Sequence, residues 1–381
     1  MTTTAPPAWQ RAADTLVRTL RAKGAVRTDP VARALREVPR HLFVSGHYAG
    51  PEGFTAVDPE RPTPETLETV YSDRGLMTHV PGDASGTSSS TSQPSIVAKM
   101  LEAAALEPGM DVLEIGAGTG WNSALIAHIT GGPVTTVEHS ALVADEARAA
   151  LARAGATGVH VHTGDGYLGH PGNGAFDRII VTCGIAGIPP AWFEQLAPNG
   201  LVLAPLAHGG MHPLARIHAP GPGGTPRARL VTMADFMTAA GPMYGDRPTP
   251  LSTRGAHLPT PVGLFDRPFP EGIDRDTFAD LCMFLAGHDP RVTCAASQDG
   301  AFGGCAVVTE DEKAGVFVQP DGLYPTGTGA ELTALAQAVT DRATAWNTGG
   351  RPPLTAWSCD LRLASGATAP LWQPDGWRVA R

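Results

Sequence analysis

Cysteine is scarce in this sequence of 381 residues, and its spacing argues against two kinds of structure. The cysteines are far apart, odd in number and without a CxxC pair; they are Cys183, Cys282, Cys294, Cys305 and Cys359. Such a pattern is typical neither of a disulfide framework nor of a zinc site. We therefore expect reduced thiols, a cytoplasmic protein and no bound metal.

Clusters of positive charge and long apolar runs are also missing. Lysine and arginine form no basic run and the formal net charge is -9, so we expect no nucleic acid partner. The sequence has no apolar stretch of about 18 residues, and its start turns amphipathic at once, without the apolar centre of a signal peptide. We accordingly expect neither a membrane span nor a secretory leader. The sequence leaves the oligomeric state open.

Glycine and proline, in contrast, are abundant, with 45 and 35 residues. This content predicts many turns and at least one linker. Seven of the prolines lie between Pro242 and Pro270, where periodicity is almost absent, which predicts an extended linker or a wrapping segment. We divide the chain into a first domain at 1–245, a Pro-rich linker at 246–272 and a C-terminal domain at 273–381.

In the first domain, apolar strands alternate with helices. After a strand that ends near residue 115, we expect helices at 121–129, 140–154 and 190–196 and strands at 133–138, 158–162, 176–182 and 200–204. This alternation predicts an α/β fold of the Rossmann-like kind, a doubly wound and mostly parallel sheet with right-handed crossovers. The C-terminal domain, with short strands and helices at 274–286 and 329–347, predicts a smaller α+β module.

The sharpest local signal is VLEIGAGTG, residues 112–120. An apolar strand ends at Glu114, and Gly116, Gly118 and Gly120 allow the backbone to turn and approach a ligand without Cβ clashes. The spacing is GxGxG rather than the GxGxxG of dinucleotide enzymes. A carboxylate just before the glycines suits the ammonium group of S-adenosylmethionine.

Two further acidic residues follow later strands of the predicted sheet. Glu138, in VTTVEHS, is placed to accept hydrogen bonds from the ribose hydroxyls of an adenosyl ligand. Asp165, in HTGDG, is placed to accept from the adenine amino group, although a helix or turn cap is an equally ordinary role for it. Strand ends on one edge of such a sheet are where these folds bind ligands.

These segments resemble one known family, that of the protein-L-isoaspartyl O-methyltransferases. TSQPSIVAKMLEAAALEPGMDVLEIGAGTGWNSALIAHI, VEHS, HTGDG and FDRIIVTCGIAGIPPAWFEQLAPNGLVLAPL occur in the family's order, and LRAKGAVRTDPVARALREVPRHLFV resembles its opening helices. The resemblance covers roughly residues 10–240. It implies catalytic roles for Ser90, Thr91 and Ser92, with Ser92 as the active-site serine. It implies S-adenosylmethionine as cofactor, bound by Gln93, Glu114, Gly116, Gly118, Gly120, Glu138, Asp165 and Gly166.

Two features depart from the usual repair enzymes of that family. Thr91 stands before the serine where they usually carry an apolar residue, and about 140 residues follow the family core. Both features are similar to the longer methyltransferases associated with ribosomally made, modified peptides of the graspetide and lanthipeptide kind. The C-terminal part also carries Trp346, Trp357, Trp372 and Trp377, which form either a peptide-binding surface or an aromatic core.

Methylation of a carboxylate suits this set of residues because an aspartyl or isoaspartyl side chain is already ionised at neutral pH and needs no general base. We therefore predict methyl transfer from S-adenosylmethionine to an Asp carboxylate in a modified, cyclised precursor peptide, with an ester that can form aspartimide or isoaspartate. One alternative is repair of L-isoaspartyl residues in proteins. Another is a peptide-binding scaffold without catalytic activity.

Overall fold

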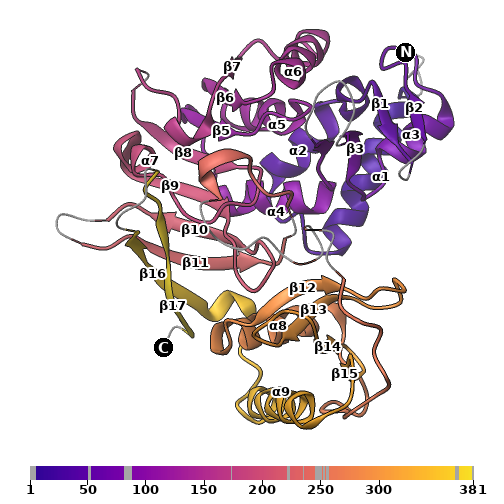
Figure 1. The fold of residues 1–381 in the computed structure, drawn as a ribbon. Helices are drawn as coiled ribbons and strands as arrows, with labels where there is room; N and C mark the ends of the chain where they lie inside the picture. Colours follow the sequence, from indigo (N-terminus) through magenta and orange to yellow (C-terminus); the bar gives the residue numbers. More distant parts are fainter. Residues whose placement is uncertain are drawn as a thin grey trace. The chain divides into compact units, whose positions relative to one another are not determined.

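The computed structural model describes residues 6–49, 53–80, 88–172, 174–220, 224–234, 236–244, 251, 254, 257–364 and 369–379 (Figure 1). The chain divides into two compact units. The first comprises Met1–Cys183 and Pro189–Ala204, and the second comprises Gly184–Ile188 and Pro205–Arg381. This division follows packing, whereas the division at residues 245 and 273 follows composition, and the latter stays a prediction.

A parallel sheet forms the centre of the first unit. Its strands have the order β9-β8-β5-β6-β7. Their bounds are Val112–Ile115 for β5, Val134–Glu138 for β6, Val159–Thr163 for β7, Phe176–Val181 for β8 and Leu196–Pro205 for β9. β5 and β6 are buried along their whole length, as expected of central parallel strands. The predicted doubly wound sheet is confirmed, and its strand order reverses beside β5, where such folds bind ligands.

Helices connect these strands largely where the sequence predicts them. The helices are α4 at Pro94–Ala104, α5 at Trp121–Thr130, α6 at Ala141–Arg153 and α7 at Pro190–Glu194. Pro94 begins α4 because a proline in the first turn has its φ already set and lacks only an N–H that has no partner in the helix. Gly131, with φ of 60°, ends α5 in the left-handed conformation that favours glycine.

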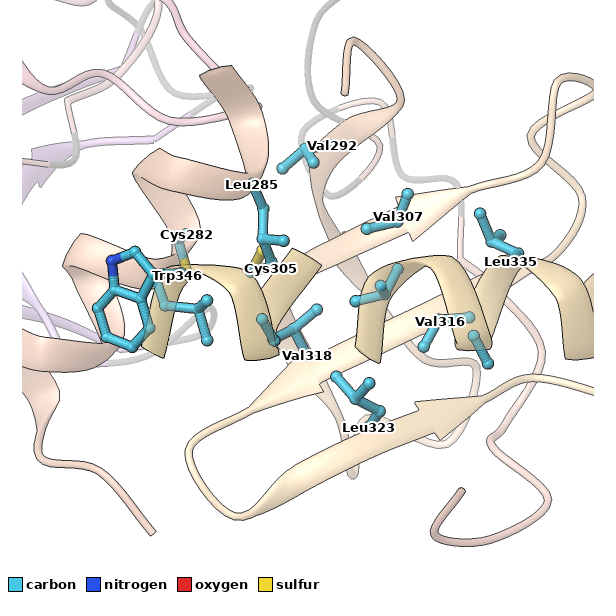
Figure 2. Close-up of a cluster of buried hydrophobic side chains, with 14 of the residues drawn as sticks. Cys282, Leu285, Val292, Cys305, Val307, Val316, Val318, Leu323, Leu335 and Trp346 are labelled. Carbon is cyan, nitrogen blue, oxygen red and sulfur yellow. The ribbon is translucent and has the colours of Figure 1, made fainter. Parts of the chain in front are cut away.

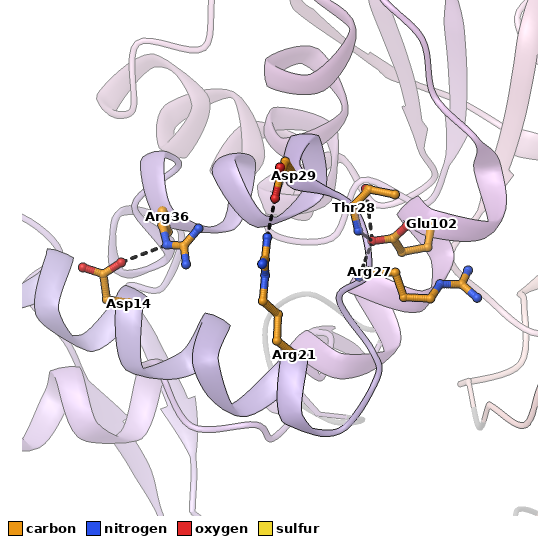
Figure 3. Close-up of polar contacts among 7 residues, drawn as sticks. All are labelled: Asp14, Arg21, Arg27, Thr28, Asp29, Arg36 and Glu102. Atoms are coloured by element: carbon orange, nitrogen blue, oxygen red, sulfur yellow. Dashed lines mark hydrogen bonds and ion pairs between the residues drawn. The ribbon is translucent and has the colours of Figure 1, made fainter.

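Three helices lie near the N-terminus, and charged side chains join the first two to each other and the start of the second to α4 (Figure 3). They are α1 at Ala8–Ala22, α2 at Asp29–Glu37 and α3 at Pro64–Val70. Glu102 of α4 accepts the backbone N–H groups of Arg27 and Thr28, each at 2.8 Å, and so satisfies donors just before α2. Two ion pairs join α1 to α2: Arg21 to Asp29 at 2.5 Å and Arg36 to Asp14 at 2.9 Å.

Short antiparallel pairs that the sequence did not predict follow these helices. β1 at Gly46–Tyr48 pairs with β2 at Phe54–Ala56, and β3 at Leu76–His79 pairs with β4 at Ser89–Thr91. Each of these strands has only three or four residues, too few for an apolar alternation to be visible. The hydroxyl-rich segment is therefore part of a small sheet rather than a plain loop.

The second unit contains two antiparallel sets of strands. One has the order β17-β16-β11-β10, with β10 at Leu214–His218, β11 at Arg227–Thr232, β16 at Trp357–Leu363 and β17 at Trp372–Val379. The other has the order β12-β13-β14-β15, with β12 at Val292–Ala296, β13 at Gly303–Val308, β14 at Gly315–Gln319 and β15 at Gly322–Pro325. With α8 at Arg275–His288 and α9 at Ala330–Thr348, this is the predicted α+β arrangement.

The β12–β15 sheet buries side chains on both faces because neighbouring residues of a strand point to opposite sides. Figure 2 shows the face that packs against α8 and α9, with Val307 of β13 and Val316 of β14 toward Leu285 and Leu335 of the helices. The opposite face carries Ala306, Val308 and Phe317, and it is covered by Leu251 and Leu258.

The described part of the predicted linker lies on this sheet. Leu258 is 1% exposed and forms a parallel bridge with Ser297. The N–H groups of Val262 and Phe265 donate to the carbonyls of Pro325 and Leu323 at 3.0 and 2.8 Å. Of the two predicted forms, residues 257–272 adopt the wrapping one, while most of 246–256 lies outside the described residues.

Two of the C-terminal tryptophans resolve the choice between surface and core. Trp346 and Trp357 are 0% and 1% exposed, so they are core residues. Trp372 and Trp377 are half-buried in β17.

Replacing Leu258 by Ala is expected to lower the free energy of unfolding by about 2–5 kcal/mol, because it leaves a cavity under a fully covered sheet face. Val262→Ala is the matched control, since Val262 lies in the same segment but is 61% exposed, and we expect a change within about 0.5 kcal/mol. Urea unfolding measures both. Equal effects of the two variants would show that Leu258 does not seal this core.

Candidate functional site

The glycine segment between β5 and α5 forms a tight loop. Gly116, Gly118 and Gly120 have φ values of 95°, 51° and 82°, in the left-handed region that favours glycine. At Gly116 an added Cβ would lie 2.4 Å from Oγ1 of Thr182, whose hydroxyl donates to the Gly116 carbonyl at 2.6 Å. The loop backbone is therefore free of side chains where it turns.

Glu114, the carboxylate before these glycines, is fully buried. It accepts hydrogen bonds from Asn122 Nδ2 at 2.7 Å, from Thr136 Oγ1 at 2.7 Å and from the Ser123 hydroxyl. Burial raises the pKa of Glu114 to about 7, while these donors act in the opposite direction. Glu114 thus ties the start of α5 to β6, and in the described structure it offers no accessible surface to a ligand.

Glu138 ends β6 beside the glycine loop. Its carboxylate accepts the Gly118 N–H at 3.2 Å and the Ser140 N–H at 3.1 Å, and it pairs with His139 Nδ1 at 3.1 Å. Burial by itself raises the pKa of Glu138, but the hydrogen bonds from His139, Ser140 and Gly118 outweigh it and bring the pKa below its usual value. A carboxylate ionised at neutral pH therefore stands at this strand end.

Asp165 and Gly166 follow β7. Asp165 is exposed and accepts the Tyr167 N–H at 2.9 Å, so it caps the short 3-10 helix at Gly166–Leu168. The Gly166 carbonyl accepts from Trp192 Nε1 at 2.9 Å. The capping role left open by the sequence is the one seen here, and the outer carboxylate surface stays accessible to a ligand.

The hydroxyl row divides between the two faces of β4. Ser89 and Thr91 are 6% and 2% exposed, whereas Ser90 and Ser92 are half-buried. This is the alternation expected of a strand, in which successive side chains point to opposite sides. Thr91, which the sequence grouped with Ser90 and Ser92, therefore faces away from them. Gln93 follows and directly precedes α4, with its carbonyl accepting the Ile96 and Val97 N–H groups.

β4 lies directly against the glycine loop. A Cβ added at Gly118 would stand 3.3 Å from the Ser90 carbonyl and 3.9 Å from Ser89 Oγ. A small cavity here is lined by both segments, including Ser89, Gly118 and Thr119, and by Glu146 and Arg153 of α6. The structure thus brings together β4, the glycine loop and Glu138, with Glu114 buried and Asp165 on the surface.

Sequence reasoning missed Arg40, the charged residue most closely involved with this site. Arg40 is 0% exposed, donates to the Ser92 carbonyl and lies over the ring of Trp121, the first residue of α5. The available signal was an arginine inside VPRHLFV, where apolar residues on both sides indicate a buried position. Trp121 itself is 2% exposed and belongs to the core.

A cysteine and two histidines elsewhere in the chain have side chains that could serve as a nucleophile or as metal ligands. Burial raises the pKa of Cys183 to about 12, so this thiol stays protonated and is no nucleophile. His208 and His212, both in the second unit, are buried against Trp377 and Tyr244. Within the described ranges, no group of three His, Cys, Asp or Glu side chains is arranged to hold a metal ion. No helix among those residues is long and apolar enough to cross a bilayer.

The loop and its acidic neighbours match a family of known proteins. The family model of protein-L-isoaspartate(D-aspartate) O-methyltransferase (PCMT) matches residues 11–229, more than half of the chain. The chain belongs to this family. PCMT proteins are S-adenosylmethionine-dependent carboxyl O-methyltransferases, and this chain is one by membership.

Curated PCMT relatives cover the same part. The protein-L-isoaspartate O-methyltransferase of Pyrococcus horikoshii is 38% identical over 198 residues, which are 52% of this chain and 77% of that protein. That of Thermotoga maritima is 35% identical over 181 residues, which are 47% of this chain and 51% of that protein. Nothing in these similarities separates peptide-maturation enzymes from repair enzymes.

A solved structure of a protein-L-isoaspartate O-methyltransferase resembles nearly the whole PCMT chain. It covers 91% of this chain and 96% of its own, with a TM-score of 0.53 and 24% identity. At this identity the likeness concerns the fold alone. It confirms the Rossmann-like methyltransferase fold with an additional C-terminal part, and it shows that an extension of this kind also occurs on a chain of the family's ordinary name.

The residues of this PCMT chain fit S-adenosylmethionine. The loop turns through positive φ at its three glycines, and Glu138 is an ionised acceptor beside it. Among the described residues, Asn122 Oδ1 is buried without a hydrogen-bond partner, while the amide nitrogen of the same side chain is held by Glu114. An acceptor oriented in this way suits an ammonium group.

Glu114→Gln is expected to reduce the pH dependence of stability. Because the pKa of Glu114 is raised to about 7 on folding, its stabilising effect is complete below its unfolded pKa and is lost as pH rises through 7. The free energy of unfolding of the wild type relative to Glu114→Gln should therefore fall between about pH 4.5 and 7.5, on the order of 3 kcal/mol. Urea unfolding at several pH values measures it, and a pH-independent difference would contradict the buried carboxylate.

Gly116→Ala is expected to weaken cofactor binding at least about tenfold, because backbone strain and the contact with Thr182 displace the loop. A tenfold weakening corresponds to a loss of roughly 1.4 kcal/mol of binding free energy. The control is Gly155→Ala, where φ is 68° but an added Cβ meets nothing within 4 Å. Calorimetry with S-adenosylhomocysteine reports the affinity. Equal weakening in both variants would attribute the effect to global strain instead of the loop.

Proposed function

We propose that the protein transfers a methyl group from S-adenosylmethionine to the free α-carboxylate of an L-isoaspartyl residue in a protein or peptide. The observation that carries this proposal is the contact of β4 with the glycine loop, where the Ser90 carbonyl stands 3.3 Å from a Cβ added at Gly118. The strand that carries the proposed acceptor hydroxyls and the loop proposed to hold the methyl donor then lie next to each other.

The proposed chemistry depends on positioning. The acceptor carboxylate is ionised at neutral pH, so no general base is required. Ser90 of β4 and Ser92 just after it, both half-buried, donate to one carboxylate oxygen and leave the other free for attack. Neutral donors suit this task, because a paired lysine or arginine would reduce the nucleophilicity of the oxygens. Holding the reacting atoms in line contributes up to roughly 7–11 kcal/mol. Thr91 has no part in this proposal because it faces the other way.

The cofactor roles are proposed for residues of the same unit. Glu138 accepts the ribose hydroxyls, Asp165 the adenine amino group, and Gln93, Gly166 and the loop glycines line the ligand. Since Glu114 already accepts three hydrogen bonds and Asn122 Oδ1 has no partner, we assign the ammonium group to Asn122 Oδ1 and give Glu114 the task of orienting Asn122. When bound, S-adenosylmethionine supplies an electrophilic methyl group and leaves as S-adenosylhomocysteine.

The ester product then reacts without help from the protein. A carboxylate oxygen has formed a bond to the methyl carbon, and the esterified carbonyl is now a better target for the following backbone nitrogen. Attack by that nitrogen closes a succinimide ring and releases methanol. Hydrolysis of the ring gives aspartyl or isoaspartyl products.

Maturation of a modified precursor peptide is the second candidate. Its support is the hydroxyl-rich segment at 88–92, which exceeds what a repair enzyme carries. Two observations weigh against it: Thr91 lies on the face opposite to Ser90 and Ser92, and a long C-terminal part also occurs on a solved chain of the family's ordinary name. The scaffold hypothesis has less support still, because the family is one of enzymes.

Methyl transfer to a generic L-isoaspartyl peptide, with the matched L-aspartyl peptide as control, tests the proposal. We expect fast transfer to the isoaspartyl peptide and at least about 100-fold slower transfer to the aspartyl one, since an extra methylene shifts the carboxylate from its aligned position. Inertness toward both, with methylation of a cyclised Asp peptide, would support maturation. No transfer to any peptide by cofactor-bound protein would support the scaffold.

In the same assay Ser92→Ala is expected to lower kcat by about 10- to 100-fold, with cofactor affinity nearly unchanged. Ser88→Ala, in the same hydroxyl-rich segment but before β4, should keep the wild-type rate. Wild-type turnover of Ser92→Ala would remove Ser92 from the site.

A further inference from the structure

Arg40 holds four backbone carbonyls from inside the first unit. It lies in the 3-10 helix at Arg40–Phe43 and is 0% exposed. Its guanidinium donates to the carbonyls of Val70 at 2.6 Å, Ser72 at 3.2 Å, Arg74 at 3.1 Å and Ser92 at 2.9 Å. The same group stands 4.8 Å from the ring centroid of Trp121.

This arrangement is costly and therefore calls for a reason. Within the described part of the chain Arg40 forms no ion pair, so four carbonyls, the face of Trp121 and the nearby charge of Asp73 compensate its burial. Burial lowers the pKa of Arg40 to about 9, which still leaves the guanidinium protonated at neutral pH.

The contacts of Arg40 fall into two groups. Three of the carbonyls that accept from Arg40 belong to residues 70–74, the turn between α3 and β3. If Arg40 only stabilised that turn, these three contacts would be sufficient. The Ser92 carbonyl and the Trp121 ring lie elsewhere. Ser92 directly follows β4, the strand that carries the hydroxyl row, and Trp121 directly follows the last glycine of the loop.

We infer that Arg40 is a positioning residue for methyl transfer, which sets the place of Ser92 relative to the glycine loop. This inference rests on the proposed function. The guanidinium lies over the ring of Trp121, and its hydrogen bond to the Ser92 carbonyl holds the Ser92 backbone. One rigid group thereby fixes the position of the proposed acceptor segment relative to the loop proposed to hold the methyl donor.

Lysine cannot take over this task. A guanidinium presents five N–H donors in one plane, whereas an ammonium group presents three donors from a point and has no flat face for an indole ring. Arg40→Lys keeps the charge and loses the geometry. A displacement of about 1 Å at a reacting group costs up to roughly 100-fold in rate.

A double-mutant cycle between Arg40→Lys and Ser92→Ala tests the inference, with kcat and KM for an L-isoaspartyl peptide and the calorimetric Kd of S-adenosylhomocysteine as readouts. We expect Arg40→Lys to lower kcat about 100-fold in the wild-type background and less than about threefold in Ser92→Ala, with Kd changed less than about threefold. Arg36→Met, which removes a partly exposed arginine paired with Asp14, is the control and should keep wild-type kinetics.

Each outcome decides between roles. Equal losses in both backgrounds would make Arg40 a structural staple and overturn the inference. If Arg40→Lys does not fold, Trp121→Phe replaces it, since this variant keeps all four hydrogen bonds of Arg40 and reduces the aromatic face under it. A several-fold loss in kcat that occurs with wild-type Ser92 but not with Ser92→Ala supports the inference. An equal loss in both backgrounds overturns it. A wild type inactive on every isoaspartyl peptide would overturn the proposed function and the inference with it, whereas an active wild type with additive losses overturns only the role of Arg40.

Discussion

The close approach of two backbones, at Gly118 and Ser90, is the constraint on which the site depends. An added Cβ at Gly118 would come within 3.3 Å of the Ser90 carbonyl, so any larger residue would push β4 away from the loop. The same glycine donates its N–H to Glu138 at 3.2 Å. One residue without a side chain thus lies in contact with the segment proposed to hold the acceptor and with the carboxylate proposed to hold the donor.

Buried ionisable groups surround this approach, and each orients a neighbour instead of facing solvent. Glu114 holds Asn122, Ser123 and Thr136, which fixes the start of α5 against β6. Arg40 holds the Ser92 carbonyl and stacks on Trp121. Such groups stabilise a fold only when their partners are well placed, and removing one partner leaves an uncompensated charge. A site that works by positioning requires such buried, well-partnered groups around the glycine loop.

The second unit has a buried core of its own. Its β12–β15 sheet is buried on both faces, by α8 and α9 on one side and by Leu251 and Leu258 on the other. The side chains of Trp346 and Trp357 are buried in this unit and form no surface for a peptide. The residues beyond the family core therefore build a folded unit, and their number does not by itself support the maturation hypothesis.

The sequence by itself determined the doubly wound sheet, the glycine loop and the acidic strand ends, because these follow from periodicity and from local backbone requirements. It also indicated the family through motifs within single segments. Tertiary structure alone decided the rest. The alternation that separates Thr91 from Ser90 and Ser92 exists only because β3 pairs with β4, and a strand of three residues leaves no pattern to read. Glu114 is covered by side chains from α5 and β6, and Arg40 acts on residues 30 to 52 positions away. Long-range contacts of this kind carry no local signal, so they are visible only in the folded chain.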